Sequence, residues 1–392
     1  MLWGRFRGRR RVRFRLTTAG WLFLGASALV AVTALNSGLA LLFVMFGCMV
    51  GALHISAVLS RRMLVAVTVR RDAPPRCRQN QRVGLSYLLR TVRRGGSALA
   101  LEVSEVGLKD VELSPAYCGY LPARQEHLSR TEMTAHRRGR IRLRRLQLAT
   151  TFPFGLVRAM RHYEQGTSLV VWPARGRLKS DLIGRGASES ASATPSIIAG
   201  GQEEFYGLRE YRLGDNARWI HWRRSAGRAE PVIREMARPR PRTLWVVLDT
   251  RLADGSRPVR AARERAIRLA GTLIEDALAG GYRVGGAFAY RRDVVVIPPG
   301  ERHAQRHRLL DALAGIDGNR ANALDGTIAQ LRPAWLHQAH TVVVSASADV
   351  EAEAGESLMR LRRDCRELTV LDGGRLTEVF QDAAAPAGKE GA

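Results

Sequence analysis

A long apolar stretch dominates the amino-terminal part of the chain. No Asp, Glu, Lys or Arg occurs from Leu16 to Leu59. One membrane-spanning helix needs about 20 apolar residues, so the stretch is too long for one helix and suits two. Asn36-Ser37-Gly38 supplies a turn, and we expect helices at about 18–35 and 39–59. A signal peptide is the alternative, but the apolar stretch resumes directly after the small residues at 32–34.

Arginine is concentrated at both outer ends of this stretch. Seven arginines lie between Arg5 and Arg15, Arg61 and Arg62 follow the second span, and none lies in the turn. The positive-inside rule therefore predicts a hairpin with both ends in the cytoplasm. We expect a multi-pass protein of the inner or plasma membrane, whose basic amino terminus and hairpin occupy residues 1–62 and whose remaining residues are cytoplasmic.

The pattern of apolar positions changes to a period of two after Met63. Alternation of this kind, interrupted by Pro74-Pro75, Gly95-Gly96 and Ser114-Pro115, is typical of short strands that are buried on one face. It predicts a β-rich, sandwich-like domain over residues 63–173. Residues 174–200 are rich in Gly, Ser and Ala and are expected to form a flexible linker. The clearest alternating segments are 64–69, 83–88, 98–103 and 141–146.

Strand and helix patterns alternate after residue 240. Thr243 to Leu248 form a nearly continuous apolar run that ends in Asp249, as in a buried parallel strand. Apolar residues then recur at helical spacing between Val259 and Ala277. A doubly wound α/β domain is expected over 241–381, followed by a disordered tail at 382–392. Its further strands are expected at 283–290, 294–297, 340–345 and 367–371, and its further helices at about 302–315, 322–332 and 351–363.

The segment 201–240 is dense in charged and aromatic residues. Asp215 follows Gly214 and stands where a helix N-cap would, with the backbone N–H of Ala217 or Arg218 as its donor. Trp219 and Trp222 are three residues apart and would share one helical face. Sequence alone therefore predicts a capped short helix anchored by two buried indole rings, whose replacement by Ala would destabilise the protein by about 3 kcal/mol or more.

The motifs of this segment resemble the bacterial family known as domain of unknown function 58. Arg223 departs from the lysine that is more frequent in the family, and a double-span amino terminus is usual there. The residues that carry the resemblance are Glu204-Phe205, Gly207-Leu208-Arg209-Glu210-Tyr211, Gly214-Asp215, Arg218 to Ala226 and Val232-Ile233-Arg234-Glu235, with Arg138-Gly139-Arg140 and Phe152-Pro153-Phe154-Gly155-Leu156 upstream.

The resemblance implies a fold and partners but no known activity. The carboxy-terminal part of the family is similar to von Willebrand factor type A domains, and its genes often lie beside those of MoxR-type AAA+ ATPases and transglutaminase-like membrane proteins. Type A domains hold Mg²⁺ at an Asp-x-Ser-x-Ser loop. Here Asp249 is followed by Arg251 and Ala253 in the two serine positions. The site is degenerate, and we expect no metal and no cofactor.

Composition allows three classes of function. The formal charge is +26, but 59 of the 62 basic residues are arginine, a bias that a GC-rich genome produces without selection for nucleic acid. Four cysteines without C-x-x-C spacing exclude a zinc ribbon. An enzyme using Asp215, His221 and Glu204, and an arginine-rich nucleic-acid binder, are the alternatives to an interaction protein.

We expect a membrane-anchored, non-enzymatic interaction or scaffold protein, the partner of a MoxR-type AAA+ ATPase in the assembly or maturation of an envelope-associated complex. A transglutaminase-like membrane protein is a second candidate partner, the lipid bilayer is a third contact, and no nucleic acid is expected. No catalytic residue is assigned. The expected partner-binding residues are Arg209, Tyr211, Asp215, Arg218, His221, Trp222, Arg223, Ser225 and Asp249.

Overall fold

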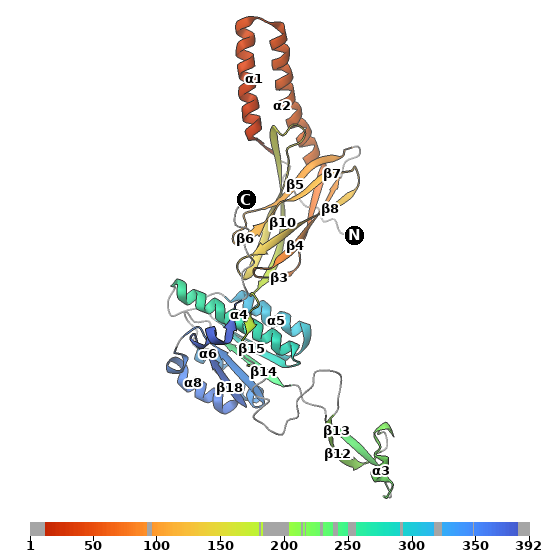
Figure 1. Cartoon of the computed structure of the whole chain (residues 1–392), viewed down its shortest axis with the longest axis vertical. Coiled ribbons are helices and arrows are strands. Elements are labelled where there is room, and N and C mark those ends of the chain that lie inside the picture. The colour runs from red at the N-terminus through yellow and green to blue at the C-terminus, as the bar shows by residue number, and fades with distance from the viewer. Residues whose placement is uncertain are drawn as a thin grey trace. The chain divides into compact units, whose positions relative to one another are not determined.

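The structure is a computed structural model of the whole chain (Figure 1). It describes residues 12–91, 96–179, 182, 204–212, 215, 217–227, 230–237, 242–249, 256–290, 293–316, 324–347 and 349–382. The chain divides into two compact units, with the first division after Ala174. The linker expected at 174–200 lies mostly outside the described residues, as do the tail from residue 383 and Arg5 to Arg11.

Two apolar helices, α1 (Thr18–Ser37) and α2 (Ala40–Ala66), stand at the start of the first unit (Figure 1). Both are long and apolar enough to cross a membrane. Thr17 caps α1 by accepting the backbone N–H of Gly20 at 3.0 Å. Gly38 ends α1 in a left-handed conformation, with φ at 67°, and its N–H bonds to the Ala34 carbonyl. The structure thus confirms the pair of helices and the turn between them.

Helix α2 continues beyond the two arginines that were expected to end it. Residues 64–66, expected in a strand, form its last turn, so that part of the strand prediction is wrong. The reason is a tertiary contact that the apolar pattern does not record. Arg161 donates through Nη1 to the carbonyls of Leu64 at 2.9 Å and Val65 at 3.4 Å. A cation at a helix carboxyl end stabilises the unpaired carbonyls there.

The rest of the first unit is a sandwich of two sheets. The first sheet contains β1 (Val12–Leu16), β3 (Arg76–Arg78), β5 (Ala98–Val106), β7 (Ala116–Leu121), β9 (Gly139–Thr150) and β10 (Val157–Trp172). The second contains β2 (Val67–Asp72), β4 (Arg82–Thr91), β6 (Val111–Leu113) and β8 (Glu126–Ala135). Their orders are β1-β10-β9-β5-β7, with β3 beside β10, and β2-β4-β8-β6. Alternate residues of both sheets, such as Leu85, Leu89, Leu101 and Leu146, fill one apolar core.

Strand β1 corrects the view of residues 1–62 as only a basic terminus and a hairpin. Its five residues pair antiparallel with β10, so that Arg15 lies opposite Arg158 and Val12 opposite Arg161. The alternation in Val12-Arg13-Phe14-Arg15-Leu16 was masked by the surrounding arginines. The sandwich therefore begins before the first apolar helix and continues after the second.

The loop between β9 and β10 holds the bases of both apolar helices. Thr17 Oγ1 donates to the Gly155 carbonyl at 2.6 Å, and Ser60 Oγ donates to the Phe152 carbonyl at 2.8 Å. Gly20 packs directly on this loop, because an added Cβ would lie 2.1 Å from the Leu156 carbonyl oxygen. These contacts fix the helical pair to the sandwich.

Gly20→Ala is expected to lower the stability of the first unit by about 1–3 kcal/mol, because the new methyl group overlaps a backbone carbonyl that cannot move freely. Gly25→Ala is the matched control, since it lies in the same helix and an added Cβ meets nothing within 4 Å. Thermal unfolding of the full chain in detergent measures both. Equal melting temperatures for the two variants would contradict the packing described.

A buried ion pair joins the two sheets inside the sandwich. Arg71 donates through Nε and Nη2 to the two carboxylate oxygens of Glu105, at 2.7 and 2.6 Å, and neither side chain is exposed. Arg71 Nη1 donates to the carbonyls of Leu143 and Gln165, and Tyr87 donates to Glu105 at 3.0 Å. Burial, with the carboxylate beside it, raises the pKa of Tyr87 far above its ordinary value. The network satisfies both charges in the core.

The second unit contains a mixed α/β sheet. Its strands are β14 (Thr243–Leu248), β15 (Arg283–Tyr290), β16 (Asp293–Gly300), β17 (Ala339–Val344) and β18 (Glu367–Leu371), in the order β16-β15-β14-β17-β18. Four strands are parallel, and β16 is antiparallel to β15. The two-residue connection between β15 and β16 is too short for a crossover, which explains this antiparallel edge. The α/β character expected from the sequence is confirmed.

Helices cover both faces of this sheet. They are α4 (Arg257–Ala279), α5 (Arg302–Gly315), α6 (Leu324–Ala329), α7 (Pro333–Leu336) and α8 (Val350–Asp364), followed by the short α9 (Arg375–Val379). Residues of α6, α7 and α8 pack on Trp245 and Val343 on one face. On the other face, Leu309 of α5 packs at Gly286, and Arg306 of α5 pairs with Glu275 of α4 at 2.7 Å. Two short strands, β11 (Arg177–Leu178) and β19 (Phe380–Gln381), pair with each other.

Candidate functional site

A separate β-hairpin carries the dense motif of the sequence. Strands β12 (Glu204–Glu210) and β13 (Val232–Ala237) are antiparallel, with a register shift between Phe205 and Gly207. The connection contains a 3-10 turn, η2 (Ala217–Trp219), and one helical turn, α3 (Trp222–Ser225). In Figure 1 the hairpin is the green element that carries the labels β12, β13 and α3.

The connection folds back onto β13 through backbone and hydroxyl contacts. His221 donates its backbone N–H to the Val232 carbonyl at 2.8 Å, and Ser225 Oγ accepts the N–H of Val232 at 2.9 Å. Ser225 also donates to the His221 carbonyl at 3.1 Å. Val232 and Ile233 are buried beneath the connection. The hairpin therefore presents a fixed surface rather than a loose loop.

A bidentate ion pair closes the connection, and we call it the Arg209–Asp215 clasp. The guanidinium of Arg209 donates to both Asp215 oxygens, at 2.6 and 2.7 Å. Asp215 also accepts the backbone N–H of Arg212 at 2.8 Å. Tyr211 donates its hydroxyl to the Asp215 carbonyl at 3.3 Å. Parallel N–H···O bonds of this kind specify geometry as well as charge.

The N-cap prediction for Asp215 is therefore wrong. Its carboxylate turns back to Arg209 and Arg212 instead of forward to Ala217 or Arg218. The preceding strand supplies a charged bidentate donor, which is a stronger partner than a backbone amide. The single helix expected to carry both indoles is also absent, because Ile220 and His221 interrupt it to bridge and bond with β13.

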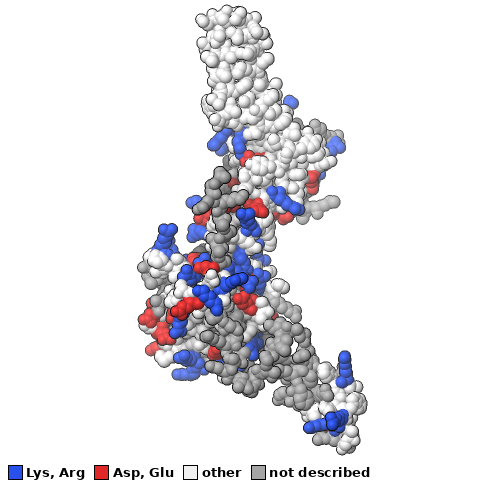
Figure 2. All heavy atoms as spheres, viewed as in Figure 1, with Lys and Arg blue, Asp and Glu red and all other residues white. Residues whose placement is uncertain are grey.

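The indole of Trp222 contradicts the expectation that both tryptophans are buried. It is 69% exposed, whereas Trp219 is half-buried. Arg218, Arg223 and Arg224 are exposed as well. On the face seen in Figure 2, Lys and Arg side chains stand on the hairpin. An exposed aromatic ring beside guanidinium groups has a composition that is common at the energetic centres of protein interfaces, where Trp and Arg are enriched.

The hydrogen bonds from Arg209, followed by the N–H of Arg212, hold the pKa of Asp215 below its ordinary value, at about 2. A carboxylate with a lowered pKa stabilises the fold above its unfolded pKa, and this contribution disappears as the pH falls through about 2. We expect Arg209→Lys to raise the pKa of Asp215, because an ammonium cannot donate along two parallel axes.

Carboxyl-carbon NMR of the aspartate-labelled chain measures this pKa in both proteins. Arg212→Lys is the matched control, since Arg212 contributes its backbone N–H and keeps it in the variant. A midpoint for Asp215 that is unchanged in Arg209→Lys, or that moves equally in both variants, would contradict the clasp.

Asp249 directly follows β14 of the α/β sheet, whereas the eight other predicted site residues belong to β12 and the hairpin connection. It is buried at the end of β14, and its carboxylate accepts the Ser345 hydroxyl at 2.8 Å. Ser345 in turn accepts the backbone N–H of Ser347 at 3.1 Å. Ser345 directly follows β17, so this hydrogen bond joins the carboxyl ends of two neighbouring parallel strands.

The other positions of the degenerate metal loop, Arg251 and Ala253, lie outside the described residues. Within the described part of the chain, no group of three or more His, Cys, Asp or Glu side chains could hold a metal ion. The side chain of Glu204 is not among those described. His221 directly precedes α3 and is half-buried, and none of the described residues forms a hydrogen bond with its Nδ1.

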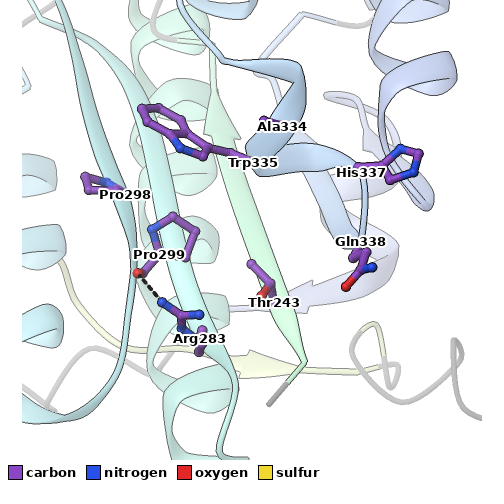
Figure 3. Close-up of a pocket in the computed structure, with 8 residues that line it drawn as sticks. All are labelled: Thr243, Arg283, Pro298, Pro299, Ala334, Trp335, His337 and Gln338. Atoms are coloured by element: carbon purple, nitrogen blue, oxygen red, sulfur yellow. Dashed lines mark hydrogen bonds between the residues drawn. The ribbon is translucent and has the colours of Figure 1, made fainter. Parts of the chain in front are cut away.

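A pocket lies at the opposite, amino-terminal edge of the sheet (Figure 3). Its lining includes Arg283, Pro299, Trp335 and His337. Arg283 is already engaged, because it donates to the Pro299 carbonyl at 3.4 Å and lies 3.6 Å from the carboxylate of Glu301. Trp335 stacks on Trp245 with ring centres 5.8 Å apart. This pocket could not be predicted from the sequence, since its residues come from four distant segments.

The comparisons with known proteins agree with the motif assignment. No curated protein matches the chain. The model of the family described as Protein of unknown function DUF58 matches residues 207–373, from the hairpin through the α/β sheet. This match supports the assignment of the chain to the DUF58 family, which its motifs resemble.

Proposed function

We propose that the protein is a membrane-anchored, non-enzymatic interaction protein and that the β12–β13 hairpin is its partner-binding surface. One observation carries the proposal: the exposed Trp222, followed directly by Arg223 and Arg224, stands on a connection that the Arg209–Asp215 clasp holds in place. A preorganised surface loses little conformational entropy on binding. The clasp would serve binding by holding the connection in place.

The chemistry of the surface favours an acidic protein partner. Arg223 and Arg224 are exposed, and the Asp215 carboxylate between the strands is neutralised by Arg209. Positively charged side chains at the edge of an interface speed association with an acidic surface and orient it. The aromatic ring would supply the contact that becomes buried on binding. The family resemblance implies a MoxR-type AAA+ ATPase as the partner, with a transglutaminase-like membrane protein as the second candidate.

The proposal also places the protein in the inner or plasma membrane with its folded units in the cytoplasm. Two apolar helices of sufficient length and the arginines at both outer ends support this arrangement. The α/β unit is assigned a von Willebrand factor type A-like fold, which is supported by four parallel strands covered by helices on both faces. Membrane anchoring would hold the hairpin where an envelope-associated complex is assembled or matured.

Cross-linking followed by purification from native membranes tests the function. The full chain, carrying a terminal tag, is cross-linked in cells and recovered with detergent, and a second tagged protein with two apolar spans serves as the control for nonspecific capture. Repeated recovery of an AAA+ ATPase with this chain alone supports the proposal. Absence of such an ATPase under efficient cross-linking contradicts the assigned partner.

A further inference from the structure

Four arginines flank the two apolar helices in the chain. Arg13 and Arg15 belong to β1, Arg61 and Arg62 belong to α2, and all four are exposed. The first acidic residue of the chain is Asp72, so none of these arginines has an acidic neighbour in the sequence. Glu102, an acid of β5 in the same sheet as β1, is paired with Arg158 at 2.7 Å. We call these four residues the juxtamembrane ring.

Two hydrogen bonds tie the chain beside these arginines to one loop. Thr17 donates to Gly155 and Ser60 donates to Phe152, so the same short loop holds both helices at these residues. Arg15 lies two residues before Thr17, and Arg61 directly follows Ser60. The ring residues therefore lie close in the chain to the two contacts that hold the helices on the sandwich, and α2 continues about one turn beyond Arg61 and Arg62 to Ala66.

Exposed aromatic side chains lie at the same level. Phe14 lies between Arg13 and Arg15 and is 44% exposed, while Phe154, on the loop that holds the helices, is 57% exposed. Trp21, in the first turn of α1, is 64% exposed. Aromatic rings of this kind are typical of the boundary between hydrocarbon and headgroups. In Figure 2, Lys and Arg side chains lie at the base of the helical pair, and none lies along its length.

We propose that the juxtamembrane ring binds the headgroups of anionic phospholipids. This inference rests on the membrane anchoring in the proposed function, and it adds a ligand class and the residues that select it. Guanidinium groups donate in parallel to phosphate oxygens, and the aromatic side chains at the same depth keep the ring in contact with the headgroups. Each arginine close to an anionic surface contributes about fivefold in affinity.

Native mass spectrometry of the full chain in detergent, with phosphatidylglycerol or phosphatidylcholine added, measures this selectivity. The wild-type chain is expected to retain phosphatidylglycerol at least tenfold better than phosphatidylcholine. Replacement of all four ring arginines by Gln is expected to abolish the preference. The matched control replaces four exposed arginines on strands farther from the helices, Arg130, Arg140, Arg142 and Arg144, and is expected to retain it.

The outcomes separate this inference from the proposed function. Release of the chain from membranes by alkaline carbonate would overturn both. A chain that stays in the membrane but binds the two lipids equally, or whose ring variant keeps the preference, overturns the lipid inference alone. Loss of a captured protein partner in the ring variant, with lipid preference intact, would also overturn it and assign the ring to that partner. Equal melting temperatures of the two variants exclude misfolding as the cause.

Discussion

Replacement of Arg71 by Met is expected to destabilise the β-sandwich by about 3–5 kcal/mol, because it leaves the Glu105 carboxylate buried without a counter-ion. Both side chains are fully buried, and the guanidinium also donates to two backbone carbonyls. Denaturant titration of the full chain in detergent, with hydrogen exchange read out in β2 and β5, measures the loss where it occurs.

A matched variant distinguishes the destabilisation caused by an unpaired buried charge from the stabilisation that the ion pair itself contributes. Arg71→Met combined with Glu105→Leu and Tyr87→Phe removes both charges and the hydroxyl that bonds the carboxylate. We expect it to recover about half of the loss, since an apolar replacement restores packing while the carbonyls of Leu143 and Gln165 still lack their donor. If Arg71→Met alone were as stable as the wild type, the stabilising role of this network would be contradicted.

Replacement of Trp222 by Ala is expected to weaken partner binding by at least about 30-fold, the effect of losing a hot spot of about 2 kcal/mol. The same change should shift the free energy of unfolding by less than about 0.5 kcal/mol, because the ring is largely exposed. Binding of the full chain to the cross-linked partner, after purification of both, measures the first effect, and thermal unfolding measures the second.

Tyr117→Ala is the control for this variant. Tyr117 lies on β7 of the sandwich and is 68% exposed, which matches Trp222 in exposure and aromatic character. It is expected to leave both partner affinity and stability unchanged. Strong destabilisation by Trp222→Ala would instead indicate that the indole is buried and stabilises the fold, as the sequence alone suggests.

The elements that the sequence predicts well are those whose apolar period is local. The uncharged run from Leu16 to Leu59 and the β-strand at 243–248 each follow from composition within one element. The two ends of the apolar hairpin are harder to predict from the sequence. Strand β1 is hidden among arginines, and α2 extends to Ala66 because Arg161, almost a hundred residues away, bonds its last carbonyls.

The dense motif of the sequence forms one element of the structure, but its internal geometry differs from the prediction. The motif pointed to residues 201–240, and the family match begins within them. The role of Asp215 could not be predicted, because an N-cap and a clasp use the same carboxylate and differ only in where Arg209 stands after the chain turns. Exposure of Trp222 was also unpredictable, since an i, i+3 spacing indicates a shared face only if one helix continues through both residues.

Site-specific photo-cross-linking from position 222 tests the central claim most directly. A photoreactive amino acid with an aromatic side chain replaces Trp222 in the full chain, so that a ring is kept at this position, and the same amino acid in place of Tyr117 serves as the control. Illumination of intact cells is predicted to join position 222 to an AAA+ ATPase and to give no such adduct from position 117. Recovery of the ATPase by general cross-linking, without any adduct from position 222 or with an equal adduct from position 117, would contradict the assignment of the hairpin as the partner-binding surface.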